Sequence, residues 1–235
     1  MEENSRYSRQ IHKDLFTIKE QQLLANSTVV ICGSGGLGTP AATYLAMAGV
    51  GTIHLIDYDT IELSNLNRQF MYCSDDIGKP KALILAQRLS KLNEEINVYA
   101  HVLDFAVDSL TDDIFSSCDI ILDCLDSMKA RAVLGQKAIK LNKSVIHGGI
   151  RTWFGQISIF YPNEKVTLYH LPQLEEEKPF TPTLGAIPGI IGASQALEAL
   201  KFLTKIPTID SRNIYVYDGL LMKWSCYNKE IFITE

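Results

Sequence analysis

The sequence lacks paired cysteines. Its 235 residues include five cysteines at widely separated positions, and none of them belongs to a Cys-x-x-Cys pair. An odd number of isolated thiols is typical of a reducing compartment and argues against a disulfide framework. The pattern also lacks the two cysteine pairs of many structural zinc sites. We therefore expect free thiols, no structural zinc and a cytoplasmic protein.

The sequence also lacks any apolar run near the ~18 residues of a membrane-spanning helix. Residues 1–5 are acidic and polar, so they do not resemble the apolar core of a signal peptide. The formal net charge of −5 argues against a broad nucleic-acid binder. Neither a membrane nor a nucleic acid is an expected partner.

The chain does contain an alternation of apolar strand patterns and amphipathic helix patterns. Strands are expected at 28–32, 52–57, 97–102, 119–123 and 144–148, and helices at 37–48, 79–92, 108–116 and 128–141. One or two further helices are expected within residues 7–25. Such βα alternation predicts a parallel sheet with helices on both faces.

From residue 155 the pattern changes to alternating, half-exposed strands, which are expected at 156–161, 213–218, 221–227 and 230–234. Residues 162–182 have no clear period, and loops of that length are usually functional. A mostly apolar helix is expected at 188–205. The predicted fold class is therefore α/β, a Rossmann-like doubly wound, mostly parallel sheet that antiparallel strands extend at the C-terminal side.

No repeat or strong linker divides the chain, so residues 1–235 are expected to form a single domain. With 46% hydrophobic residues, the chain can bury one large core. Its expected parts are N-terminal helices at 6–25, a nucleotide-binding core at 27–150, a crossover loop at 162–187 and a C-terminal helix with strands at 188–235.

A glycine-rich turn follows the first expected strand, with the sequence Gly33-Ser34-Gly35-Gly36-Leu37-Gly38. Glycines let the backbone approach a polyphosphate, and the helix that follows offers unpaired N–H groups at its N-terminus. The second expected strand ends in Asp57, where a carboxylate can accept both ribose hydroxyls. Taken alone, this turn is most often part of a dinucleotide site.

Three further blocks carry charges that a hydride-transfer site does not require. They are Ser64-Asn65-Leu66-Asn67-Arg68-Gln69, Gly78-Lys79-Pro80-Lys81 and Asp123-Cys124-Leu125-Asp126. Fixed cations stabilise the charge that develops on phosphates during phosphoryl or nucleotidyl transfer. The blocks therefore indicate chemistry on the phosphates themselves.

Together with the runs at 6–11 and 192–199, these blocks occur in an order that resembles the ThiF/MoeB/HesA family. Members of that family are ATP-dependent adenylyltransferases of sulfur-carrier proteins and are related to ubiquitin-activating enzymes. The resemblance spans roughly residues 6 to 220, and seven ordered blocks are far more specific than any one motif.

The resemblance implies an ATP site and a role for each matched residue. Nucleotide contacts are implied for Gly35, Gly36, Gly38, Asp57, Asp59, Asn65, Arg68, Gln69, Lys81 and Asp126. The residues expected to carry the catalysis are Arg9, Arg68, Lys81 and Asp126, and Asp126 is expected to hold Mg²⁺. In the family the arginine at the place of Arg9 reaches the partner's ATP site, which implies a homodimer.

The chain also departs from the family pattern. Leu168 and Leu171 stand where many members have the first pair of zinc cysteines, and the C-terminus has no second pair. The cysteine that some relatives use in covalent sulfur chemistry falls near Thr181, with no cysteine nearby. Cys73 is expected to be the exposed thiol. The other four cysteines (Cys32, Cys118, Cys124 and Cys226) are expected in the core, as is His147.

The resemblance predicts adenylation of a C-terminal carboxylate, with an acyl-adenylate and pyrophosphate as products. The expected substrate is a small ubiquitin-like sulfur carrier in thiamine, molybdopterin or related sulfur-transfer biosynthesis. One alternative substrate is a short precursor peptide with a free C-terminus. Alternatives of another class are a nucleotide-binding module without turnover and an NAD-dependent dehydrogenase.

Overall fold

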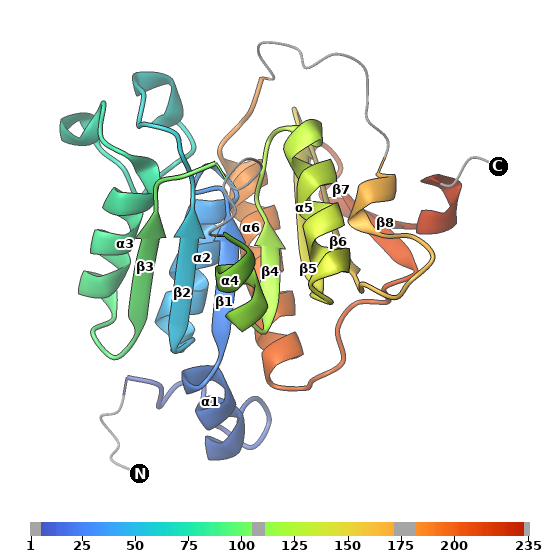
Figure 1. Ribbon diagram of the computed structural model, residues 1–235, viewed down its shortest axis with the longest axis horizontal. Helices are drawn as coiled ribbons and strands as arrows, with labels where there is room; N and C mark the ends of the chain where they lie inside the picture. Colours follow the sequence, from blue (N-terminus) through green and yellow to red (C-terminus); the bar gives the residue numbers. More distant parts are fainter. Residues whose placement is uncertain (1–5, 105–110, 172–181, 233–235) are drawn as a thin grey trace.

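The computed structural model describes residues 6–104, 111–171 and 182–232. Its centre is an eight-stranded sheet with the strand order β3-β2-β1-β4-β5-β6-β7-β8 (Figure 1). The strands are β1 (Thr28–Cys32), β2 (Thr52–Ile56), β3 (Asn97–His101), β4 (Ile120–Asp123), β5 (Val145–Arg151), β6 (Phe154–Phe160), β7 (Asn213–Asp218) and β8 (Lys223–Asn228).

The sheet has a parallel half and an antiparallel half. β3, β2, β1, β4 and β5 pair in parallel, whereas β5 with β6, β6 with β7 and β7 with β8 pair antiparallel. The order β3-β2-β1-β4-β5 is that of a doubly wound nucleotide-binding fold, whose ligand site lies at the carboxyl ends of the strands. The predicted fold class is confirmed.

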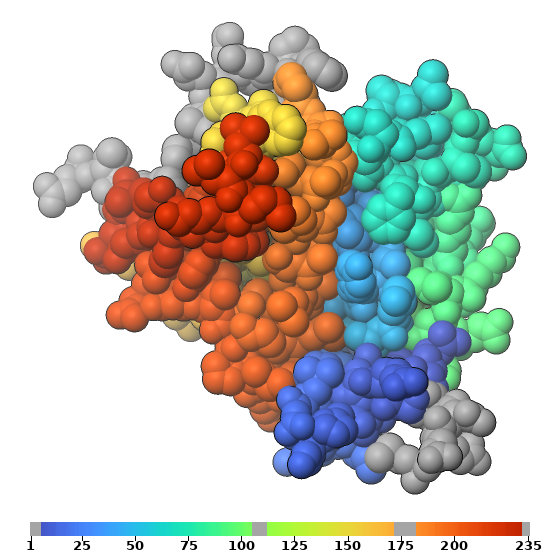
Figure 2. Space-filling view, turned by 180° about the vertical axis from the view of Figure 1, so that it is seen from behind, coloured from blue at the N-terminus to red at the C-terminus, as the bar shows by residue number. Residues whose placement is uncertain are grey.

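Helices cover both faces of the sheet (Figures 1 and 2). The α-helices are α1 (Ile18–Ala25), α2 (Gly38–Ala48), α3 (Lys81–Leu92), α4 (Thr111–Ser117), α5 (Met128–Lys140) and α6 (Ala186–Leu203). α2, α3 and α6 pack on one face, and α4 and α5 on the other. The sheet therefore separates two hydrophobic cores, the first beneath α2, α3 and α6 and the second beneath α4 and α5. In β1, Val29 and Ile31 pack into the first core and Val30 and Cys32 into the second, because successive side chains of a strand point to opposite faces.

Two expected elements differ in the structure. Residues 6–17 form turns, so the described N-terminal segment has the single helix α1, which Thr17 caps by accepting from the backbone N–H of Lys19. The strand expected at 230–234 is wrong for its described part, because Lys229–Phe232 is a 3₁₀-helix. The Lys229 ammonium is buried and donates to the Ile159 carbonyl at 2.9 Å, which turns the chain back onto the sheet.

α3 begins at Lys81, two residues later than expected. Pro80 has an extended conformation, with ψ 130°, and Gly78 has φ +85°, so the helix begins only after this turn. Three more 3₁₀-helices lie in the connections, at Leu63–Asn65, Ser74–Asp76 and Leu168–His170. Residues 172–181 of the expected crossover loop lie outside the described residues.

Candidate active site

The glycine turn lies between the carboxyl ends of β1, β2 and β4. Gly33 has φ +97°, and its N–H donates to the Ile56 carbonyl at 2.9 Å. A Cβ on Gly33 would lie 2.6 Å from the Cys124 carbonyl oxygen, and one on Gly38 would lie 1.9 Å from the Gly33 carbonyl oxygen. Only glycine fits at these two positions, and α2 begins at the second of them.

Asp57 ties the end of β2 to the glycine turn. Its carboxylate accepts the backbone N–H of Ser34 at 2.6 Å and that of Asp59 at 2.8 Å. Burial raises the pKa of Asp57, although these hydrogen bonds and the nearby charge of Lys81 oppose the rise. The carboxylate therefore holds the turn in place from the position where a ribose is expected.

Lys81 stands in the first turn of α3 and is buried. Its ammonium lies 2.7 Å from a carboxylate oxygen of Asp59, and its backbone N–H donates to the Asp59 carbonyl at 2.9 Å. The structure therefore brings together Lys81 and Asp59, both expected to contact the nucleotide.

The polar block after β2 packs against the glycine turn. Gln69 is buried close to Gly35, and its Oε1 has no hydrogen-bond partner among the described residues. Arg68 is partly exposed beside Gly36, and its Nη1 donates to the Ser64 carbonyl at 2.8 Å. Asn65 is buried, and its side-chain oxygen accepts the N–H of Glu62.

Sequence reasoning missed two residues at this end of the sheet, beside the glycine turn. The Tyr72 hydroxyl donates to the Ser34 carbonyl at 2.8 Å and lies 3.2 Å from the Lys81 carbonyl, so it joins the glycine turn to α3. Ser34 is fully buried, and its hydroxyl has no hydrogen-bond partner among the described residues. The serine inside a glycine turn was the one signal that could have suggested a polar contact there.

Asp123 and Asp126 have different surroundings at the end of β4. Asp123 is fully buried, 3.2 Å from Nε of Arg131 and 2.6 Å from Nδ1 of His147. Burial alone would raise its pKa, but the Arg131 charge and the His147 hydrogen bond outweigh burial and lower it. Asp126 is exposed at the same edge.

An acidic group surrounds the exposed side chain of Tyr58. The charge of Asp59 is the largest cause that raises the pKa of Tyr58, followed by burial and the charges of Asp104 and Asp126. Asp126 therefore lies near Tyr58 and Asp59, which follow β2. In the described part of the chain, no three His, Cys, Asp or Glu side chains are grouped so that they could hold a metal ion.

Arg9 is exposed, and its segment lies at the opposite end of the sheet, near the amino ends of the strands. Tyr7 packs on Gly49 at the end of α2 and accepts a hydrogen bond from Asn93 at the end of α3. Gln10 donates to the Ala48 carbonyl at 2.8 Å. The N-terminal segment thus lies below the amino ends of the strands (Figure 1). The structure does not bring Arg9 to the glycine turn of its own chain.

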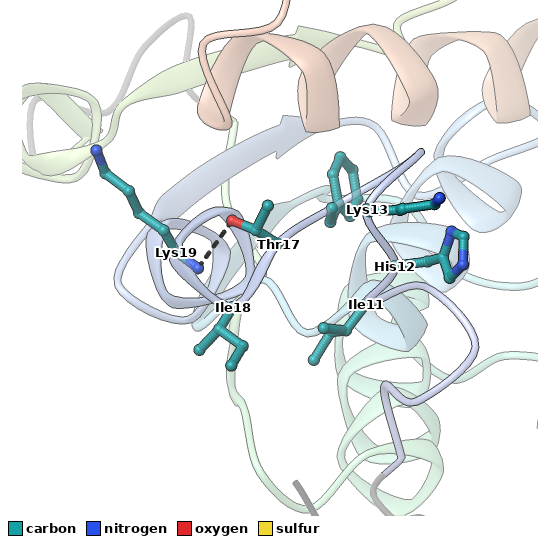
Figure 3. A pocket seen from close by; sticks show the side chains of 7 residues that line it. Ile11, His12, Lys13, Thr17, Ile18 and Lys19 are labelled. Carbon is teal, nitrogen blue, oxygen red and sulfur yellow. Dashed lines mark hydrogen bonds between the residues drawn. The ribbon is translucent and has the colours of Figure 1, made fainter.

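An open pocket of about 530 Å³ lies in this N-terminal segment, away from the glycine turn (Figure 3). Its lining residues are Ile11, His12, Lys13, Phe16, Thr17, Ile18 and Lys19. Leu15 and Ile18 are also exposed. This is an apolar surface with lysines at its border, next to the segment that carries Arg9.

The cysteines follow the expected pattern with one exception. Cys32, Cys118 and Cys124 are buried and Cys73 is exposed, but Cys226 is exposed as well. The expectation for Cys226 is wrong because β8 is the last strand of the sheet and has mostly exposed side chains. His147 is fully buried, as expected.

Leu168 and Leu171, which stand at the family's first zinc-cysteine positions, belong to the second core. The 3₁₀-helix Leu168–His170 lies so close to α5 that a Cβ on Gly135 would be 2.7 Å from the Tyr169 nitrogen. Apolar packing therefore holds this segment against α5. Among the described helices, none is long and apolar enough to cross a membrane.

Among curated proteins, the sulfur carrier protein ThiS adenylyltransferase of Escherichia coli K12 is 37% identical over 224 residues, which are 93% of this chain and 88% of that protein. The adenylyltransferase and sulfurtransferase MOCS3 of Caenorhabditis briggsae is 36% identical over 91% of this chain. The chain spans only 55% of the length of that relative.

Solved structures of E. coli MccB share the fold. The structure with ATP has a TM-score of 0.84 and 25% identity, over 97% of this chain and 71% of MccB. The structure with MccA-N7isoASN has a TM-score of 0.85 and 26% identity, over 96% and 72%. The sequence model of the ThiF family matches residues 7–230, nearly the whole chain. This protein belongs to the ThiF family.

Proposed function

We propose that this protein uses ATP to adenylate the C-terminal carboxylate of a small ubiquitin-like sulfur-carrier protein. The observation that carries the proposal is the glycine turn, with Arg68 beside it and Lys81 and Asp126 at the same edge of the sheet. The relatives confirm the predicted enzyme class, an ATP-dependent adenylyltransferase, and they act on sulfur carriers. A dehydrogenase or an inactive binding module finds no support among them.

In the reaction, an oxygen of the substrate carboxylate forms a bond to the α-phosphorus of ATP. The bond from that phosphorus to the β-phosphate oxygen breaks, and pyrophosphate leaves with its electron pair. Negative charge therefore builds on the α-phosphate oxygens and on the leaving group. We assign Gly35, Gly36 and Gly38 to the phosphate cradle, where the N-terminus of α2 favours an anion.

Arg68 and Lys81 neutralise the charge that develops on the phosphates. Lys81 is buried and already paired with Asp59, so a bound triphosphate has to share this cation with the carboxylate. Fixed donors of this kind each contribute roughly 3–4 kcal/mol to transition-state stabilisation. Asn65 and Gln69 supply amide contacts, and Oε1 of Gln69, which has no partner among the described residues, can accept such a contact.

Asp57 receives the ribose, and Asp126 holds magnesium. Magnesium is commonly bound by one or two carboxylates together with substrate phosphates and water. The exposed carboxylate of Asp126 fits that donor set, and the charges of Asp126 and Asp59 both act on Tyr58. When bound, the ion supplies positive charge against the phosphate oxygens.

The enzyme acts as a homodimer in which Arg9 completes the partner's site. Arg9 cannot serve its own chain, because its segment is packed at the amino edge of the sheet. The apolar pocket beside it offers a surface that a second subunit can cover (Figure 3). Mixing Arg9→Ala with Asp126→Ala chains should restore activity, since one hybrid site then has both residues. A monomer by light scattering would exclude this arrangement.

α6 links the glycine turn to the turn between β7 and β8, where a carrier can dock. α6 begins beside that turn, where Gly185 touches Asn67 and Pro188 touches Gly36. Gly219, in the turn between β7 and β8, touches Ile187 of α6 and Trp153. Leu220, Leu221 and Met222 follow at this turn with 62–77% of their surface exposed. This apolar tip, residues 220–222, lies at the same edge as the site and suits a protein substrate.

The five free thiols support a cytoplasmic location. The buried leucines Leu168 and Leu171 support a crossover segment without zinc, which metal analysis of the purified protein can test. The likeness to MccB favours a second candidate substrate, a short peptide with a free C-terminus.

Exchange of labelled pyrophosphate into ATP tests the proposal. We expect exchange only with a carrier that ends in a free Gly-Gly carboxylate, and none with the same carrier lacking its last two residues. Exchange with a short peptide but with no carrier would favour the second candidate. Failure to exchange with either substrate, in protein that binds ATP, would overturn the proposed activity.

A further inference from the structure

Arg131 of α5 holds the loop that carries Asp126. It is a buried charge, with 7% of its surface exposed. Its Nη2 donates to the carbonyl of Leu125 and, at 3.0 Å, to the carbonyl of Gly148 in β5. Nε of the same guanidinium lies 3.2 Å from the carboxylate of Asp123. One planar group therefore touches β4, β5 and the loop after β4.

The backbone of Leu125, the residue before Asp126, is held on both sides. Its N–H, in the peptide unit shared with Cys124, donates to Oδ1 of Asp123 at 3.1 Å, and its carbonyl accepts from Arg131. That carbonyl belongs to the same planar peptide unit as the nitrogen of Asp126. The orientation of the unit therefore sets the direction in which the chain enters Asp126.

Buried groups behind Arg131 keep its partner charged. Nδ1 of His147 donates to the carboxylate of Asp123 at 2.6 Å, and the other ring nitrogen of His147 accepts from the side-chain amide of Gln156 at 2.9 Å. Burial lowers the pKa of His147, so the ring is neutral. Of these four side chains, Arg131 and Asp123 carry charges, and the two charges neutralise each other.

We propose that Arg131 is a positioning residue, which orients the carboxylate of Asp126 toward the metal and phosphates through the Leu125 carbonyl. This inference rests on the proposed role of Asp126 in holding magnesium. Lysine can keep a charge opposite Asp123, but its ammonium is a compact point charge and lacks the planar group whose Nε faces Asp123 while its Nη2 reaches the two carbonyls. Arg131→Lys therefore separates the positioning role from the pairing of charges.

The test measures divalent-ion binding directly, with Mn²⁺ as the probe for magnesium and electron paramagnetic resonance as the readout, in the presence of ATP. Arg131→Lys should weaken Mn²⁺ binding by roughly 10- to 100-fold, as is usual when a group that orients a metal ligand is lost. ATP binding without metal should stay at the wild-type value. Arg88→Lys is the matched control, because Arg88 also pairs with a buried aspartate, Asp76, and should leave Mn²⁺ binding unchanged.

A double-mutant cycle separates positioning from a structural role. If Arg131 acts through Asp126, Arg131→Lys should have little further effect on Mn²⁺ binding in an Asp126→Asn background. Effects that simply add, or wild-type Mn²⁺ binding in a folded Arg131→Lys protein, would overturn the inference. Should Arg131→Lys melt early, Mn²⁺ binding is measured at a temperature at which its unfolding curve shows the variant to be folded. If the wild-type protein shows no exchange activity, the binding experiment still decides the role of Arg131.

Discussion

The two halves of the sheet meet solvent differently. In the parallel half, four of the five residues of β1 and all four of β4 are buried, whereas five of the six residues of β8 are exposed. Helices on both faces bury the central parallel strands β1 and β4, whose carboxyl ends lie beside the glycine turn. The antiparallel half ends in an uncovered strand, so it can offer side chains and a strand edge to a partner.

This difference assigns different tasks to the two halves. The parallel half holds the charged groups and the glycine turn that suit nucleotide chemistry. The antiparallel half contributes the apolar tip, residues 220–222, and exposed aromatic side chains such as Trp224 and Tyr227. Changes in the first half should therefore affect catalysis, and changes in the second should affect substrate binding.

The largest effect is expected at the carboxyl end of β4. Asp126→Ala should abolish pyrophosphate exchange, because it removes the proposed magnesium ligand, while the circular dichroism spectrum stays that of wild type. Asp119→Ala is the control at the amino end of the same strand, where the carboxylate accepts the N–H of Thr28 at 2.8 Å. Exchange by Asp126→Ala within threefold of wild type would contradict the site assignment.

A smaller loss is expected for the cation beside the glycine turn. Arg68→Ala should lower the exchange rate by about 10²-fold, comparable to deleting one preorganised donor. Arg212→Ala is a control in the antiparallel half, where the exposed arginine pairs with Asp210. Equal rates for the two variants would show that Arg68 does not act on the phosphates.

The apolar tip should affect the carrier and not ATP. Leu221→Asp places a charge on the proposed docking surface and should raise the KM for the carrier about tenfold, the equivalent of one lost apolar side-chain contact. The KM for ATP should not change. Leu83→Asp, at an exposed leucine of α3, is the control. If Leu83→Asp raises the carrier KM as much as Leu221→Asp does, the tip has no special role.

The smallest effect concerns stability in the antiparallel half. Lys229 lies over the Phe160 ring, and burial lowers its pKa from 10.5 to about 8. Between about pH 8 and 10.5 the unfolded chain binds more protons at this residue than the folded chain, so Lys229 makes stability rise with pH there. Urea unfolding at pH 7.5 and 10 should show this rise reduced in Lys229→Met. Lys223→Met is the control. If the stability of the two variants depends on pH in the same way, Lys229 does not cause the rise.

Much of the parallel half could be predicted from the sequence. Strand patterns and glycine turns depend on neighbouring residues, so β1, α2 and the glycine turn between them were located from local pattern alone. The alternating pattern also located β7. Patterns failed where distant contacts decide, as at Lys229–Phe232, where a buried ammonium turns an apparently alternating segment into a 3₁₀-helix.

The sequence by itself determined the family and the fold class, and it named the charged residues that are candidates for the nucleotide site, because motifs and strand and helix patterns follow from residue type and spacing. Only the tertiary structure decided that Arg9 lies at the opposite edge, that Lys81 pairs with Asp59, and that Arg131 holds the Leu125 carbonyl. Each of these depends on contacts between segments that are distant in the chain. Such contacts form only when the sheet brings strand ends together, so no local pattern could contain them.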